Sequence, residues 1–160
     1  MLELKDTVKR MRPGTRLLVT RSDEPSTGGA VESVLAHGPT LAVIERSALV
    51  SRLFVVPGKQ VLHARAGVRD YVDTEDGSTP TVSRVMTAVL GSAQDGPNYW
   101  DQWPLHYDYL IVLGTDPDES ANPAPEWLRM IHNGRAFQLY EIVARPSGTA
   151  RLDAGMADQR

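Results

Sequence analysis

Runs of consecutive apolar residues mark the strands that this sequence predicts. The longest of these runs, at residues 109–113, lies in a strand predicted at residues 107–113, and such a run is typical of a strand buried on both faces of a sheet. Shorter runs predict further strands at residues 16–20, 41–45 and 136–143. Residues 60–64 read as one more extended segment after a Pro-Gly turn.

Apolar residues at helical spacing predict the helices between these strands. Residues 2–11 form a short amphipathic helix, Ser26 or Thr27 caps a second one that ends before residue 38, and residues 80–90 form a third. A helical turn or two is expected at residues 47–54. Around Trp127, four residues before Ile131, we expect a helix that crosses between the strands at 107–113 and 136–143.

This alternation predicts an α/β fold of three layers. We expect a mostly parallel, Rossmann-like sheet of about four to five strands with flanking helices, in one domain over residues 1–145. Residues 65–80 read as a surface loop, with an edge strand near residues 68–72 as the alternative. Small and polar residues predominate from 146 to 160, which predicts a disordered tail.

Composition narrows the possible partners. The 160 residues are 41% apolar and 23% charged, with a net charge of −3 and basic residues that are scattered along the chain. The sequence therefore lacks the stripe of basic residues that would indicate binding to nucleic acid. Without cysteine there is no disulfide, thiolate nucleophile or cysteine-bound metal, and no apolar run reaches the length of a membrane span.

Two segments that follow predicted strands are candidates for a ligand cleft. Ser26 and Thr27 precede two glycines at the start of a helix, where free amides could receive a phosphate, but no phosphate-binding glycine motif is complete. Asp116 and Asp118 follow the strand at 107–113, where an Asp-x-Asp pair could hold a divalent metal. The intervening proline favours a plain turn. The residues therefore predict no metal, cofactor or catalytic set.

Aromatic residues gather just before the longest strand. Flat amphipathic rings at this density could stack on sugars or dock a partner, or could form a flap that covers one face of the sheet. Burial is the commoner fate of large aromatic side chains. The cluster consists of Tyr99, Trp100, Trp103, Tyr107 and Tyr109.

Several segments, taken together, resemble one protein family. They are PGTRLL at 13–18, LAVIER at 41–46, LF at 53–54, PGKQ at 57–60, YDYLIV at 107–112 and GRAFQLY at 134–140. This set is similar to the domain that follows the last membrane span in bacterial polytopic proteins related to lipid-linked-sugar glycosyltransferases of the dolichyl-phosphate-mannose protein mannosyltransferase type. The resemblance covers most of residues 10–145.

The resemblance implies an accessory domain at the extracytoplasmic face of the bacterial cell membrane. The family's acidic catalytic residues lie in loops of the membrane portion, so the resemblance assigns no catalytic residue to this chain. Its implied partners are the membrane portion of a parent protein and a glycan or lipid-linked sugar. The helix at 2–11 would continue from a membrane span, where its basic side chains Lys5, Lys9, Arg10 and Arg12 would suit lipid headgroups. A contact surface is expected at Glu45, Arg46, Trp100, Trp103 and His106.

Two other classes of function remain open. A free-standing cytoplasmic enzyme or ligand-binding protein would use the carboxyl ends of the strands, with Ser26, Thr27, Asp116 and Asp118 in one cleft that suits a nucleotide or nucleotide-sugar. An interaction module would dock through Trp100 and Trp103.

Overall fold

The computed structural model describes residues 2–24, 35–53, 67–73, 79–89, 98–118 and 121–143. Within these residues a five-stranded sheet has the order β2-β1-β3-β5-β4. Four strands point the same way, and β5 is antiparallel to both of its neighbours. The strands are β1 (Arg16–Arg21), β2 (Leu49–Val50), β3 (Tyr109–Leu113), β4 (Leu128–Asn133) and β5 (Phe137–Ile142).

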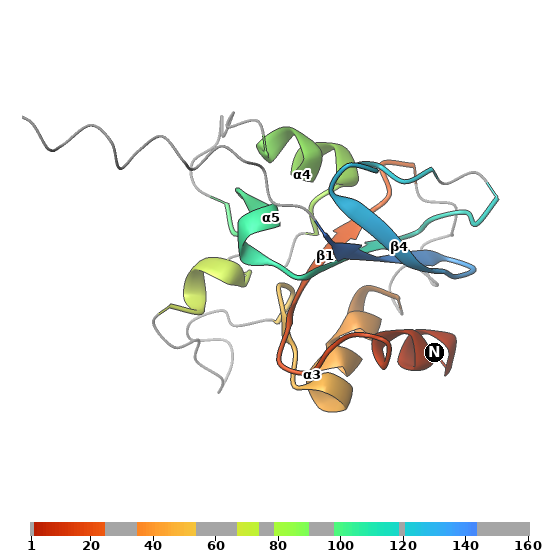
Figure 1. Ribbon diagram of the computed structural model, residues 1–160, viewed down its shortest axis with the longest axis horizontal. Coiled ribbons are helices and arrows are strands. Elements are labelled where there is room, and N and C mark those ends of the chain that lie inside the picture. The colour runs from red at the N-terminus through yellow and green to blue at the C-terminus, as the bar shows by residue number, and fades with distance from the viewer. Residues whose placement is uncertain are drawn as a thin grey trace, which may run out of the picture.

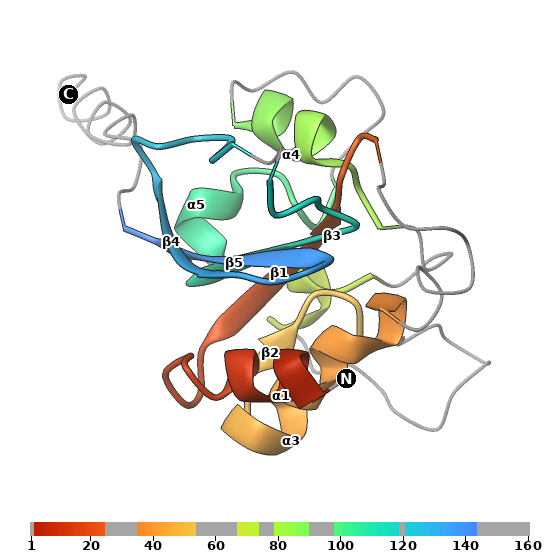
Figure 2. The ribbon, with the colours of Figure 1, turned by 90° about the vertical axis from the view of Figure 1, so that its right-hand side faces the viewer.

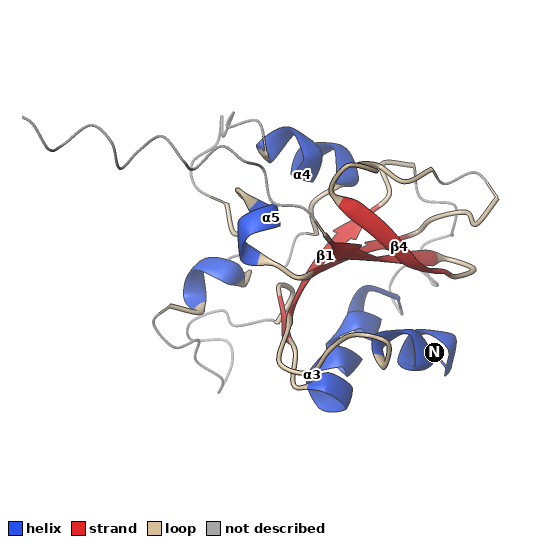
Figure 3. Ribbon diagram, in the orientation of Figure 1, coloured by secondary structure: helices blue, strands red, loops and turns tan. Residues whose placement is uncertain are grey.

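Helices cover both faces of this sheet, which gives three layers (Figures 1 and 3). One face carries α1 (Leu2–Val8), the 3-10 turn η1 (Gly38–Thr40) and α3 (Leu41–Arg46). The other face carries α4 (Val82–Ala88) and α5 (Trp103–His106), as the rotated view also shows (Figure 2). A second 3-10 turn, η2, spans Arg69–Tyr71. The predicted α/β character and layering are therefore confirmed.

The sheet separates two hydrophobic clusters. The cluster under α1 and α3 includes Leu4, Val8, Leu17, Ala42 and Ile111, among others. The cluster under α4 and α5 contains Leu18, Val85, Trp100, Trp103, Tyr107, Leu110, Val112, Ala124, Leu128 and Tyr140. Alternate residues of β1 and β3 enter opposite clusters, as the period of a strand requires. All five residues of β3 are buried, which confirms the strand predicted from the longest apolar run.

The predicted strand at residues 41–45 is wrong, because this segment is helix α3. A short apolar run has no periodicity that separates a buried strand from a helix. Only Ala42 is buried in α3, whereas Ile44 is 81% exposed. The helix ends at Ser47, whose φ of 50° is left-handed, and β2 then pairs with β1 where a helical turn at 47–54 was expected.

The predicted crossover helix around Trp127 is also wrong. Residues Leu128–Asn133 form β4, which pairs with β5 as an antiparallel hairpin. Pro125 and Gly134 leave only eight residues between them, too few for a helix that spans the sheet. Trp127 is half-buried in the turn before β4, and Ile131 is half-buried on the strand. Because β5 is antiparallel to β3, the expected parallel βαβ unit is absent here.

Other predictions have mixed outcomes. The helices at 2–11 and 80–90 are confirmed as α1 and α4, and the strands at 16–20 and 136–143 as β1 and β5. The proposed edge strand near 68–72 is the turn η2 instead. The extended segment at 60–64, most of the helix after Ser26 and the tail at 146–160 lie outside the described residues. In the described part of the chain, no helix combines the length and apolarity that crossing a membrane requires.

Candidate functional site

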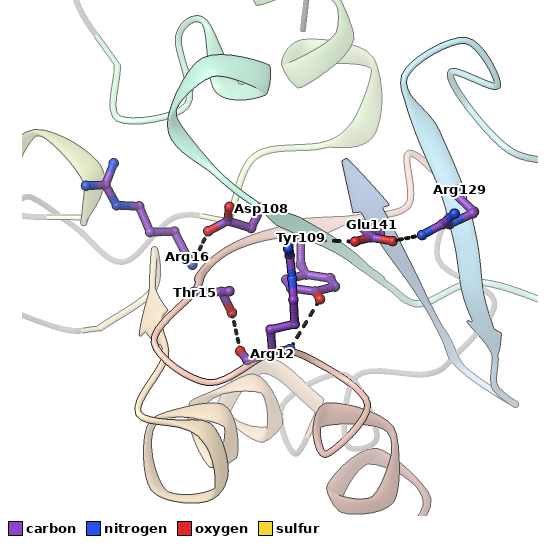
Figure 4. A network of polar contacts seen from close by, with 7 residues as sticks. All are labelled: Arg12, Thr15, Arg16, Asp108, Tyr109, Arg129 and Glu141. Atoms are coloured by element: carbon purple, nitrogen blue, oxygen red, sulfur yellow. Dashed lines mark hydrogen bonds and ion pairs between the residues drawn. The ribbon is translucent and has the colours of Figure 1, made fainter. Parts of the chain in front are cut away.

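A network of polar contacts joins the connection between α1 and β1 to the edge of the sheet (Figure 4). The backbone N–H of Arg12 donates to the hydroxyl of Tyr109 at 3.2 Å, although the two residues are 97 positions apart. Tyr109 and Glu141 are paired across β3 and β5. The guanidinium of Arg12 lies 3.7 Å from the Glu141 carboxylate, which also pairs with Arg129 of β4.

These contacts raise the pKa of Arg12 and hold the backbone around it in place. The Tyr109 hydroxyl, followed by the charges of Glu141 and Asp108, raises the pKa of the Arg12 guanidinium above its ordinary value. The Thr15 hydroxyl donates to the Arg12 carbonyl at 2.7 Å and closes the turn. The network therefore holds the chain between α1 and β1 in one position relative to three strands.

Next to this network, Asp108 and Arg16 bind the amino ends of β1 and β3 together. The backbone N–H of Arg16 donates to the Asp108 carboxylate at 2.9 Å, and the Asp108 N–H donates back to the Arg16 carbonyl at 3.0 Å. The Arg16 side chain reaches the other way, 4.5 Å above the Tyr71 ring, and donates to the His106 carbonyl at 3.2 Å. A cation above a ring of this kind is stabilising.

The aromatic cluster before β3 is mainly core. Trp103 is fully buried and Trp100 is 7% exposed. The Tyr107 hydroxyl shares its one proton between the carbonyls of Tyr99 and Tyr71, which lie 2.8 and 3.0 Å away, and burial raises the pKa of this hydroxyl well above its usual range. His106 remains half-buried, with its ring 5.0 Å from that of Tyr71.

The expected contact surface does not form a single surface. Glu45 and Arg46 lie on α3, whereas Trp100, Trp103 and His106 lie on the opposite face of the sheet (Figure 1). Glu45 pairs with Lys5 at 3.2 Å, and Arg46 donates to the Lys9 carbonyl, so both residues bind α3 to α1. The two groups of residues do not lie together because residues 41–46 form a helix on the α1 side of the sheet, and not a strand beside residues 107–113.

At the carboxyl end of β1, Asp23 holds the start of α4. Its carboxylate accepts from the Ser83 hydroxyl at 2.5 Å and from the Ser83 N–H at 3.2 Å. Burial acts to raise the pKa of Asp23, but the hydrogen bonds from Ser83 and Thr81 and the charge of Arg21 together lower it. The Arg21 N–H also donates to the Pro80 carbonyl at 3.0 Å.

At the carboxyl end of β3, Asp116 accepts from the Asp118 N–H at 2.9 Å. A relay of polar groups holds the same loop to the hairpin. The Tyr140 hydroxyl donates to Gln138, the Gln138 amide donates to Asn133, and the Asn133 amide donates to the Pro117 carbonyl at 3.0 Å. Burial raises the pKa of Tyr140 to about 12, so it stays a donor at neutral pH.

The predicted ligand cleft is only partly within the described structure. Asp116 and Asp118 lie at the carboxyl end of β3, whereas Ser26 and Thr27 lie outside the described residues. Among the described residues, no group of three or more His, Asp or Glu side chains could hold a metal ion. Thr115, next to Asp116, is only 4% exposed, and its buried hydroxyl has no hydrogen-bond partner.

Few of the residues that form these networks could be predicted from local sequence. Glu141 was expected on the strand at 136–143 with no further role, and no role was assigned to Asn133. One local signal was present, because the dipeptide Asn133-Gly134 is typical of turns. The partners of Tyr109, Glu141 and Asp23 are distant in sequence and have no local signal.

Comparison with protein-family models, curated proteins and solved structures finds no match to this chain.

Proposed function

We propose that this chain is a non-catalytic accessory domain of a glycosyltransferase-like polytopic membrane protein, at the extracytoplasmic face of the bacterial membrane. In this role it stabilises the parent protein, or positions an acceptor or partner that carries a glycan or a lipid-linked sugar. The starting point is the resemblance of most of residues 10–145 to such domains.

The observation that carries the proposal is the attachment of α1. Tyr109 and Glu141 hold the chain just after α1, Glu45 holds Lys5 in its middle, and the His132 ring lies 3.3 Å from Glu3 near its start. Leu4, Thr7 and Val8 are buried against the sheet and its neighbours. A segment held from several sides transmits its orientation to the whole sheet, which is what a domain attached through α1 requires.

The acids at the carboxyl ends of the strands support the same proposal. The Asp23 carboxylate accepts a hydrogen bond from the Ser83 hydroxyl, and the Asp116 carboxylate accepts one from the Asp118 N–H within its own turn. Both carboxylates therefore stabilise local structure.

Two experiments test this role. The isolated chain should fold, and should neither transfer nor hydrolyse sugar from nucleotide or polyprenyl-phosphate donors; turnover by the purified chain would reject the proposal. In the parent protein, Tyr109→Phe combined with Glu141→Gln should lower transfer, because it frees the α1 junction. Arg129→Gln is the matched control, since it removes only the pair within the hairpin and leaves the contact of Arg12 with Glu141 in place.

A free-standing enzyme or ligand-binding protein is the second candidate. It is favoured by the buried, unpartnered hydroxyl of Thr115 beside Asp116, at the end of a parallel strand. In a Rossmann-like winding of β2, β1 and β3, ligands bind at this edge of the sheet. Saturable stabilisation by a nucleotide-sugar, lost in Thr115→Val and retained in Thr87→Val on α4, would favour this candidate.

A further inference from the structure

The hairpin between β4 and β5 turns at an asparagine followed by a glycine. Asn133 is the last residue of β4 and is exposed, whereas Gly134 is buried. The Gly134 N–H donates to the Phe137 carbonyl at 2.9 Å, which closes the hairpin. Glycine has no side chain to shield its backbone nitrogen, so an asparagine that precedes glycine loses its side-chain amide most readily. The hairpin tip therefore contains the two residues that spontaneous deamidation requires.

Deamidation at this position needs only these two residues and water. The Gly134 nitrogen gives up its proton and attacks Cγ of Asn133, and the new C–N bond closes a five-membered succinimide ring. The bond between Cγ and Nδ2 breaks, and Nδ2 leaves with the added proton as ammonia. Water then opens the ring and gives aspartate or isoaspartate, and no electrons are transferred to another group.

Three hydrogen bonds oppose the first step in the folded protein. The Asn133 side chain donates to the Pro117 carbonyl at 3.0 Å and accepts from the Gln138 amide at 3.0 Å. The third bond is that of the Gly134 N–H, which must break before the nitrogen attacks. Ring closure also turns the Asn133 backbone away from the extended conformation in which it pairs with Gln138. The hairpin tip must therefore open locally before the reaction proceeds.

A polar relay behind the hairpin tip keeps Asn133 in this position. The Tyr140 hydroxyl donates to the side-chain carbonyl of Gln138 at 2.7 Å, and this bond orients the Gln138 amide toward Asn133. Tyr140 is fully buried and Gln138 is 1% exposed, so water does not compete for these bonds. The relay therefore determines how often the Asn133 side chain is free to react.

The other two asparagines of the chain are poorer sites for this reaction. Asn122 precedes Pro123, whose nitrogen carries no proton. Asn98 precedes Tyr99, whose side chain hinders the attack. Both asparagines are internal references, because they experience the same conditions as Asn133.

We infer that Asn133-Gly134 is a deamidation site that the relay keeps closed in the folded protein, and that reaction there releases the loop after β3. The Pro117 carbonyl loses its donor, because the product has a carboxylate oxygen in place of Nδ2. Isoaspartate also lengthens the main chain by one methylene group, which breaks the pairing of Asn133 with Gln138. The change is irreversible in water, and it does not depend on the proposed function.

Mass spectrometry of the 160-residue chain tests this inference. The protein is kept at mildly alkaline pH, either folded or in denaturing urea, and the gain of one mass unit is followed in the peptide that contains Asn133. Each hydrogen bond that must open should slow the reaction about fivefold, so three bonds should make it about 100-fold slower in the folded protein. In urea, Asn133 should react and Asn122 should not.

Two variants weaken the relay, and a third is their control. Gln138→Ala removes one hydrogen bond from Asn133 and should raise the rate in the folded protein about fivefold. Tyr140→Phe is the milder variant and should raise the rate about threefold. Tyr109→Phe is the matched control, because it removes a tyrosine hydroxyl at the other end of β3 and should change the rate less than about twofold. Far-ultraviolet circular dichroism shows whether each variant folds.

Asn133→Asp tests the consequence of the reaction, because it supplies the carboxylate of the product directly. The Asp118 N–H donates to Asp116 within the loop that Asn133 holds. Amide exchange at Asp118 should therefore become about fivefold faster in this variant. Exchange at Arg12, at the other end of the sheet, should not change.

Any of four results would overturn this inference. They are no reaction of Asn133 in urea, equal rates in the folded and the unfolded chain, no larger effect of the folded relay variants than of Tyr109→Phe, and unchanged exchange at Asp118 in Asn133→Asp. None of these results concerns sugar transfer, so the deamidation site and the proposed function can fail separately.

Discussion

Replacement of Trp103 should destabilise the protein in two separable steps. The Trp103 side chain is fully buried, and its indole N–H donates to the Val85 carbonyl at 3.0 Å. Val85 is among the last four residues of α4, whose carbonyls have no partner within the helix. The ring also stands edge-on to Trp127, with centroids 6.2 Å apart. Trp103 therefore both fills the core and satisfies a helix end.

The two roles have different magnitudes. Trp103→Ala removes both and should lower the free energy of unfolding by about 3–5 kcal/mol. Trp103→Phe keeps most of the apolar volume but leaves the Val85 carbonyl without its donor, which should cost about 1–3 kcal/mol. Trp127 is half-buried, so Trp127→Ala should cost about half as much as Trp103→Ala.

Urea unfolding followed by far-ultraviolet circular dichroism measures all three variants. In a chain of this length, the Trp103→Ala change corresponds to a fall in melting temperature of roughly 10 °C. A loss below about 1.5 kcal/mol for Trp103→Ala would refute this account of the core. Equal losses for Trp103→Ala and Trp127→Ala would contradict the placement of the two side chains.

Three other changes test the polar networks. Tyr109→Phe should lower the free energy of unfolding by about 1 kcal/mol, because the Arg12 N–H loses its acceptor, and should speed amide exchange at Arg12; unchanged exchange would contradict the bond. Asp23→Ala should cost about 1 kcal/mol at pH 7, since Asp23 accepts from the first turn of α4. The folded state lowers the pKa of Asp23, so its contribution is present above the unfolded pKa of about 3.9 and disappears as the pH falls through the folded value. Unfolding curves at pH 7 and pH 2 should therefore differ less in Asp23→Ala than in the native chain, and equal differences would exclude the assigned role. Millimolar Mg²⁺ or Mn²⁺ should leave the melting temperature unchanged, whereas a saturable rise that Asp116→Ala abolishes would favour the enzyme.

Much of the fold could be predicted from local pattern. The strands β1, β3 and β5 and the helices α1 and α4 lie where a run or a helical spacing of apolar residues predicts them. The buried strand β3 was the clearest case, because five consecutive apolar residues need cover on both faces. The sequence also indicated the position of Asp116 and Asp118 after this strand.

The candidate site was less predictable, because its contacts join distant residues. Arg12 meets Tyr109 across 97 positions, and Asp23 meets Ser83 across 60. No local spacing marks either pair. The expected surface around Glu45 and Trp103 failed for a related reason, since one misassigned element moved Glu45 to the opposite face of the sheet.

The sequence alone determined that β1, β3 and β5 are strands with buried residues, but the tertiary structure decided what α3 and β4 became. The four apolar residues that begin α3 can form either a helix or a strand at similar local cost. β2 occupies the position beside β1, so the α3 segment packs as a helix against α1. For β4, the partner is β5: pairing satisfies backbone groups that a short isolated helix between Pro125 and Gly134 would leave partly unbonded. Neighbours supplied by distant parts of the chain therefore chose between two conformations that local sequence left nearly equal.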